Sequence, residues 1–126
     1  MKSLQIVTSV VEAGAGLALA GFPSLTASLL LGLPLDSAPA LIMARIGGAA
    51  ILTLAVICWQ NAHSLASRDL IVALLFYNVS VATVLTFASV IDELHGVLLW
   101  PAVTFHLAMG AWCIATLLRK DEAALR

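Results

Sequence analysis

Three long apolar runs constrain this chain more than any other feature of its sequence. They cover residues 38–59, 70–91 and 97–118, and a fourth, slightly shorter run covers 4–22. A run of about 22 residues spans about 33 Å as an α-helix, which matches the hydrocarbon core of a bilayer. In lipid each backbone N–H and C=O group needs a partner within its own segment, so helices are expected rather than isolated strands. The sequence therefore predicts an all-α polytopic membrane protein, a bundle of four transmembrane helices.

The composition favours the same interpretation. Hydrophobic residues make up 62% of the chain and charged residues only 10%, whereas soluble domains carry about 25% charged residues. Lipid is therefore the expected solvent for a single domain that covers 1–126. The net charge of −1 and the lack of a basic stripe give no reason to expect a nucleic-acid partner. The two cysteines, Cys58 and Cys113, match no metal-binding or redox spacing.

The segment between the first two predicted spans contains a short apolar run between Pro23 and Pro34. This run cannot cross a membrane, so we expect a short helix, 24–33, that lies in the outer interface. The alternative is that the first helix continues past Pro23 with a kink. The N-terminal run loosely resembles a signal peptide, but Glu12 interrupts its apolar stretch, and we interpret it as the first span.

Basic residues set the expected orientation. Lys2 precedes the first span, Arg68 lies between the second and third, and Arg119, Lys120 and Arg126 follow the fourth. All of them fall on one side of a four-span topology, and the two loops on the other side have none. Because cytoplasmic segments carry the excess of Lys and Arg, both termini are expected in the cytoplasm.

Each predicted span carries one polar or ionisable residue well inside it: Glu12, Arg45, Asn78 and His106. An unpaired charge at the centre of a membrane costs about 3 kcal/mol on insertion scales, so such residues are expected to turn inward and find partners. The sequence predicts an ion pair between Glu12 and Arg45, completed by hydrogen bonds to Asn78 and His106. Tyr77 is next to this cluster in sequence and could donate to it, although packing in the core is the simpler role.

The neighbours of Glu12 support an inward orientation. Three residues share its helical face at spacings of three and four along the chain: Gln5, Thr8 and Gly16. Small residues on such faces let membrane helices approach closely. The cluster has three possible roles: it fixes the packing of the four helices, it forms a small-ligand site, or it faces a partner protein or second copy.

Three classes of function remain open. The first is a non-enzymatic accessory or structural subunit, with homo-oligomers or a larger membrane complex as partners. The second is an exporter, because four helices and a glutamate in the first span resemble the small multidrug resistance transporters, in which that glutamate binds the substrate cation or a proton. Pairing between Arg45 and Glu12 would weaken such binding.

The third class is a haem or quinone protein that uses His106. Two axial histidines need similar depth on facing helices, but His63 and His95 lie at opposite boundaries, which leaves one axial histidine or a quinone bonded to His106. The chain lacks the sequence motifs of nucleophilic and metal-dependent catalysis, so no catalytic or metal-binding residue is assigned and an enzyme is not expected.

The order of these features resembles that of the DoxX-like proteins, a group of small four-helix bacterial membrane proteins. The resemblance rests on "FPSLTASLLLGLPL" followed by "ARIGGAAILTLAVICW", chiefly on Ala44 and Arg45 followed by Gly48 and Ala49. It implies a four-helix protein of the bacterial inner membrane. It supplies no activity, cofactor or catalytic residue.

Overall fold

The computed structural model describes residues 2–62 and 68–124, and in these ranges every regular element is an α-helix. The helices are α1 (Lys2–Gly21), α2 (Pro23–Leu31), α3 (Ala38–Asn61), α4 (Arg68–Val90) and α5 (Leu99–Ala124). Four of them, all except α2, are long and apolar enough to cross a membrane. The prediction of an all-α membrane protein with four spanning helices is confirmed. His63 lies outside the described residues.

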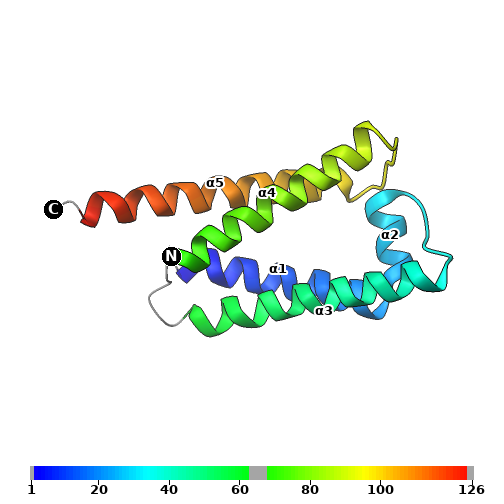
Figure 1. Ribbon diagram of the computed structural model, residues 1–126, viewed down its shortest axis with the longest axis horizontal. Helices are drawn as coiled ribbons and strands as arrows, with labels where there is room; N and C mark the ends of the chain where they lie inside the picture. Colours follow the sequence, from blue (N-terminus) through cyan, green and yellow to red (C-terminus); the bar gives the residue numbers. More distant parts are fainter. Residues whose placement is uncertain (1, 63–67, 125–126) are drawn as a thin grey trace.

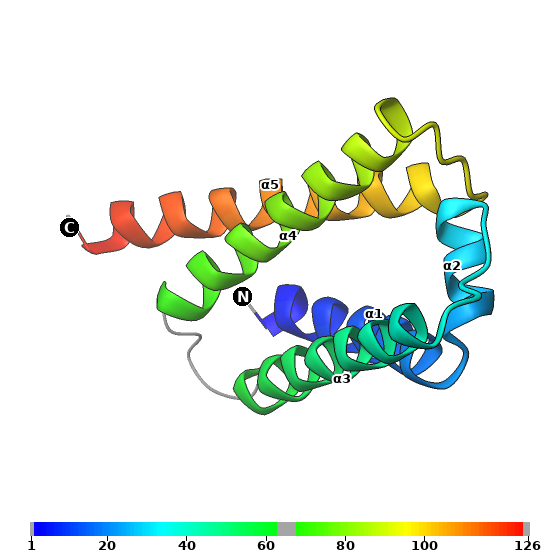
Figure 2. The ribbon, with the colours of Figure 1, turned by 45° about the vertical axis from the view of Figure 1, so that its right-hand side comes forward.

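The four long helices form two pairs, α1 with α3 and α4 with α5, and Figures 1 and 2 show the pairs lying one above the other. Glycines permit the close approach of α1 and α3. A Cβ atom on Gly48 would lie 2.6 Å from the backbone nitrogen of Ala20, and one on Gly16 would lie 2.9 Å from the Gly48 carbonyl oxygen. The Ser9 hydroxyl adds a hydrogen bond to the Ala55 carbonyl at 2.9 Å.

An apolar core joins the two pairs at one end of the bundle. Its buried members come from all four long helices: Leu4, Cys58, Ile71, Leu74, Met109 and Cys113. Both chain termini lie toward this end, which we call the terminal end (Figure 1). The two cysteines are free thiols buried in this core, where they pack as small apolar residues.

The opposite end of the bundle, which we call the α2 end, is crossed by α2. Phe22 has non-helical dihedral angles (φ −129°, ψ 58°), and Pro23 then opens α2, so the alternative of a single kinked helix is wrong. Gly32 ends α2 with φ +85°, a conformation that glycine adopts without strain. The Leu98 N–H donates to the Leu29 carbonyl at 2.9 Å, which attaches α2 to the start of α5.

The segment between α4 and α5 lies tightly against α2. A Cβ atom on Gly96 would overlap the carbonyl group of Leu30. A second apolar cluster, with buried Leu85, Leu99 and Val103, packs against Leu30 and fastens α2 to the α4–α5 pair. The α2 end is therefore held together by this one short helix, and the terminal end by a core that all four long helices share.

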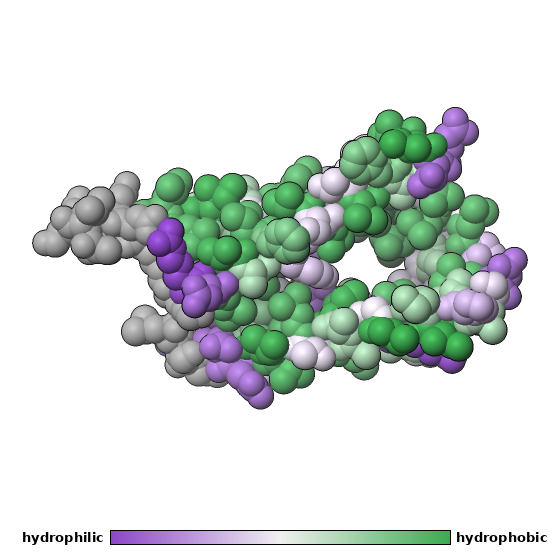
Figure 3. All heavy atoms as spheres, viewed as in Figure 1, coloured by the Kyte–Doolittle hydropathy of each residue, from purple (hydrophilic) through white to green (hydrophobic). Residues whose placement is uncertain are grey.

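The surface matches a protein surrounded by lipid. Large apolar side chains are exposed along the long helices, among them Leu17, Ile46, Phe76 and Val84. In Figure 3 apolar residues cover the middle of the visible face, and strongly polar residues gather toward its two ends. Such an exposed apolar belt is what membrane burial requires.

Candidate functional site

A cavity of about 580 Å³ lies between the two helix pairs and beneath α2, within the range of about 300–1,000 Å³ that is typical of small-molecule sites. All five helices contribute to its lining. The lining is apolar except at four side chains, Glu12, Thr26, Tyr77 and His106. An apolar chamber with a few polar groups is the usual composition of a site for a small organic molecule.

The space between the pairs is open toward the side of the bundle. Figure 3 shows an opening next to α2 that passes between the α4–α5 pair and the α1–α3 pair. The long helices have the length and composition of membrane spans, so an opening in their sides faces the hydrocarbon of the bilayer. A lipophilic molecule could reach the cavity from the membrane without passing through water.

The first polar contact of the cavity joins the two pairs. Glu12 on α1 is only 3% exposed, and the Tyr77 hydroxyl from α4 donates to its Oε2 atom at 2.8 Å. A buried carboxyl group needs such a donor, because an unsatisfied polar atom in an apolar medium is costly. Of the two roles open to Tyr77, donation to the cluster and packing in the core, the structure therefore shows the first, with Glu12 as the acceptor.

The second polar contact fixes the orientation of His106. The Asn78 side-chain nitrogen donates to the Leu74 carbonyl at 2.8 Å, and this directs the Asn78 oxygen toward His106 Nδ1 at 2.9 Å. A carbonyl oxygen only accepts, so the network assigns the proton to Nδ1. The rings of Tyr77 and Phe105 meet the imidazole nearly edge-on, with centroids 5.7 and 5.5 Å away.

The structure thus brings together three of the four predicted residues. Glu12, Asn78 and His106 form one region with Tyr77, and Glu12 and His106 line the cavity directly. The predicted inward face of the first span is also confirmed, since Gln5, Thr8, Glu12 and Gly16 are all buried. A further signal for Tyr77, which the sequence analysis did not use, is its helical spacing with Val81 and Leu85, since both line the same cavity.

Arg45 is not part of this region, and the predicted ion pair with Glu12 is wrong. Its side chain is exposed on α3, whereas Glu12 is buried and bonded to Tyr77. The two helices run in opposite directions, with Ser9 bonded to Ala55 and Gly16 packed between Gly48 and Leu52. This register places Glu12 between the levels of Leu52 and Ala55. Arg45 is therefore at least seven residues further toward the α2 end, at least about 10 Å along the axis.

The buried amide of Gln5 is the one polar group of this face that lacks a partner. Gln5 is 1% exposed, and neither its Nε2 nor its Oε1 atom makes a hydrogen bond within the described ranges. Thr8, by contrast, donates to the Leu4 carbonyl at 2.9 Å. The Gln5 amide therefore carries a desolvation penalty that nothing in the described structure offsets.

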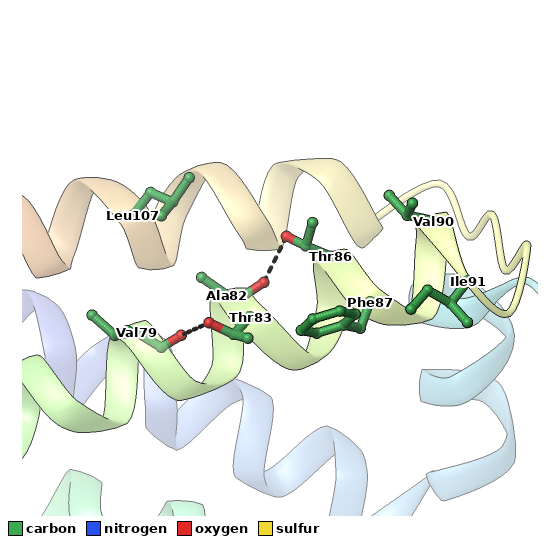
Figure 4. A pocket seen from close by; sticks show the side chains of 8 residues that line it. All are labelled: Val79, Ala82, Thr83, Thr86, Phe87, Val90, Ile91 and Leu107. Atoms are coloured by element: carbon green, nitrogen blue, oxygen red, sulfur yellow. Dashed lines mark hydrogen bonds between the residues drawn. The ribbon is translucent and has the colours of Figure 1, made fainter.

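A second, smaller hollow of about 330 Å³ lies mainly along α4, with Leu107 from α5 (Figure 4). Its two polar side chains, Thr83 and Thr86, donate to the carbonyls of Val79 and Ala82 at 2.8 and 2.7 Å. Both hydroxyl protons are thus used within α4. This hollow could hold an apolar chain, but it has few polar groups that could recognise a ligand.

Metal and haem binding receive little support from the described residues. Within 2–62 and 68–119 no group of three or more His, Cys, Asp or Glu side chains is placed to hold a metal ion. His95 follows α4 and lies near Ser89, with Oγ and Nδ1 3.4 Å apart, and it does not line the cavity of His106. The two histidines are therefore not positioned as a facing axial pair.

Comparisons with protein-family models, with curated proteins and with solved structures found no match to this chain.

Proposed function

We propose that this protein is a non-enzymatic membrane protein that binds a small lipophilic molecule between its two helix pairs. The observation that carries the proposal is the position of Glu12, Tyr77 and His106 together on the wall of an otherwise apolar cavity. The apolar tail of the ligand would fill the cavity, and its polar head would meet these three side chains.

We further propose that the protein resides in the bacterial inner membrane with both termini in the cytoplasm, as a homo-oligomer or as a subunit of a larger complex. The one-sided basic residues and the DoxX-like resemblance support this location. In this orientation the cavity lies nearer the outer leaflet, because α2 crosses the end opposite the termini.

A matched pair of variants on α1 tests the binding function. Ala15 lines the cavity, so Ala15→Phe should fill part of it. Val10 is 61% exposed on the same helix and lies outside the cavity lining, so Val10→Phe adds an aromatic ring elsewhere. We expect 1-decanol to bind the wild type and Val10→Phe saturably, and Ala15→Phe at least about tenfold more weakly, by native mass spectrometry in mild detergent. Equal binding to all three proteins would refute the proposal.

A proton-coupled exporter resembling the small multidrug resistance transporters is the second candidate, with Glu12 as the coupling site. The observation that favours it is that Glu12 borders the cavity and is not paired with Arg45. Its test is uptake of a lipophilic cation into proteoliposomes driven by a pH gradient, which Glu12→Gln should abolish. A haem- or quinone-binding role would rest on His106 alone.

A further inference from the structure

We infer that the ligand's head is a lipophilic amine with N–H bonds, one that donates hydrogen bonds to the cavity wall. The inference rests on the proposed binding function and adds the chemical class of the ligand. It follows from counting the hydrogen-bond donors and acceptors of the polar side chains that line the cavity.

The hydroxyl groups of the cavity have already donated their protons. Tyr77 uses its single hydroxyl proton on Glu12, and Thr26 donates to the Phe22 carbonyl at 2.9 Å. The Oε1 atom of Glu12 has no donor within the described ranges, and the ionised form of this carboxyl group only accepts. This side of the wall therefore presents oxygen lone pairs toward a ligand.

The imidazole presents a lone pair as well. His106 donates through Nδ1 to the side-chain oxygen of Asn78, whose nitrogen donates to the Leu74 carbonyl. In the neutral ring Nε2 is then an acceptor, and it has no hydrogen-bond partner among the described side chains. With Tyr77, Thr26 and ionised Glu12, all four polar side chains of the lining thus offer acceptors and no free donor.

An amine head suits this wall in either protonation state of Glu12. An ammonium group carries up to three N–H donors on one atom and pairs with an ionised Glu12 carboxylate, which Arg45 does not reach. A neutral amine takes the proton of a Glu12 carboxylic acid and becomes the same ammonium group. A ketone or quinone carbonyl has no proton to donate, so it would leave the acceptors unpaired. Unpaired buried acceptors penalise the wrong ligand more strongly than the right one is favoured.

Four probes with chains of similar length separate the contributions of charge and of donated protons. They are 1-decylamine, 1-decanol, 2-undecanone and decyltrimethylammonium, and native mass spectrometry with purified wild-type protein measures each affinity. We expect 1-decylamine to bind most tightly and 1-decanol more weakly. We expect 2-undecanone and decyltrimethylammonium, which have no N–H or O–H group, to bind at least about tenfold more weakly than the amine.

The outcomes distinguish this inference from the proposed function. If no probe binds saturably and with sensitivity to Ala15→Phe, the binding function itself fails. If binding is saturable and sensitive, but the ketone or the trimethylammonium probe equals the amine, only the inference about the head is overturned. As a second check, Glu12→Gln supplies an amide donor, so it should weaken the amine and strengthen 2-undecanone. An unchanged order of affinities in a folded Glu12→Gln protein would also overturn the inference.

Discussion

At the scale of single residues, the main finding is that the partner of Glu12 is Tyr77 and not the predicted Arg45. The Glu12 carboxylate accepts from Tyr77 across the gap between the helix pairs, and Arg45 is exposed at least about 10 Å away along the axis. The long aliphatic stem of arginine allows its guanidinium to reach toward a nearby membrane surface, so an inward partner is not required.

This arrangement predicts a specific coupling between side chains. Interhelical hydrogen bonds in membranes contribute about 1 kcal/mol, so Tyr77→Phe should lower the stability of the protein by about that amount. In a double-mutant cycle with Glu12→Leu, which removes the acceptor, the two losses should be non-additive. The cycle of Glu12→Leu with Arg45→Leu should be additive. Unfolding in mixed micelles measures both cycles, and coupling to Arg45 instead of Tyr77 would contradict the observed contact.

The buried Gln5 leads to an opposite expectation, a substitution that stabilises. Both of its amide atoms lack partners in the described ranges, and one buried unsatisfied group costs about 1–3 kcal/mol. Gln5→Leu should therefore raise the melting temperature in detergent. Gln60→Leu is the control, because Gln60 is exposed near the end of α3 and should change it little. A lower melting temperature for Gln5→Leu would mean that a partner or a water molecule uses this amide.

At the scale of helices, the contact between α1 and α3 depends on which glycine faces the partner. A Cβ atom on Gly48 would meet the α1 backbone at 2.6 Å, whereas one on Gly47 would meet only the Leu19 side chain at an ordinary 3.7 Å. Gly48→Ala should destabilise the protein by about 1–3 kcal/mol, the usual cost of overpacking, and Gly47→Ala should be tolerated. Thermal unfolding of the two variants checks this, and equal losses would show that the contact is not specific.

The four long helices could be predicted, because the length and the hydropathy of each apolar run can be read directly from the sequence. The face of α1 that carries Gln5, Thr8, Glu12 and Gly16 could be predicted as well, since helical spacing alone places those residues together. The partner of Glu12 could not, because it depends on the axial offset between helices. Arg45 lies seven residues from the start of its apolar run, and only the register set by the glycine contacts shows that it stays near the α2 end.

At the scale of the whole molecule, the two ends are built differently. The terminal end has a core shared by all four long helices. The α2 end depends on one short helix, which contacts Gly96 through the Leu30 carbonyl and accepts a hydrogen bond from the Leu98 N–H at the Leu29 carbonyl. The cavity lies between these two ends. The bond between Tyr77 and Glu12 joins its polar wall across the helix pairs, and its α2 side depends on the contacts of that one short helix with the α4–α5 pair.

Loosening that attachment should affect exchange of the ligand more than the fold. Gly96→Ala forces the loop away from the Leu30 carbonyl, so we expect faster dissociation of 1-decylamine with a small change in melting temperature. Gly21→Ala is the control, because a Cβ atom there meets nothing within 4 Å. Displacement kinetics with the purified variants measure the rates. Identical rates for both variants and the wild type would show that α2 does not control access.

A bundle whose helix pairs share a core at one end and are linked by one short helix at the other should also respond to the thickness of the surrounding bilayer. Membrane helices adjust their tilt to the bilayer thickness, and a change of tilt alters the space between the two pairs. The chain length of the preferred guest should then shift with the composition of the membrane, although no residue of the protein has changed.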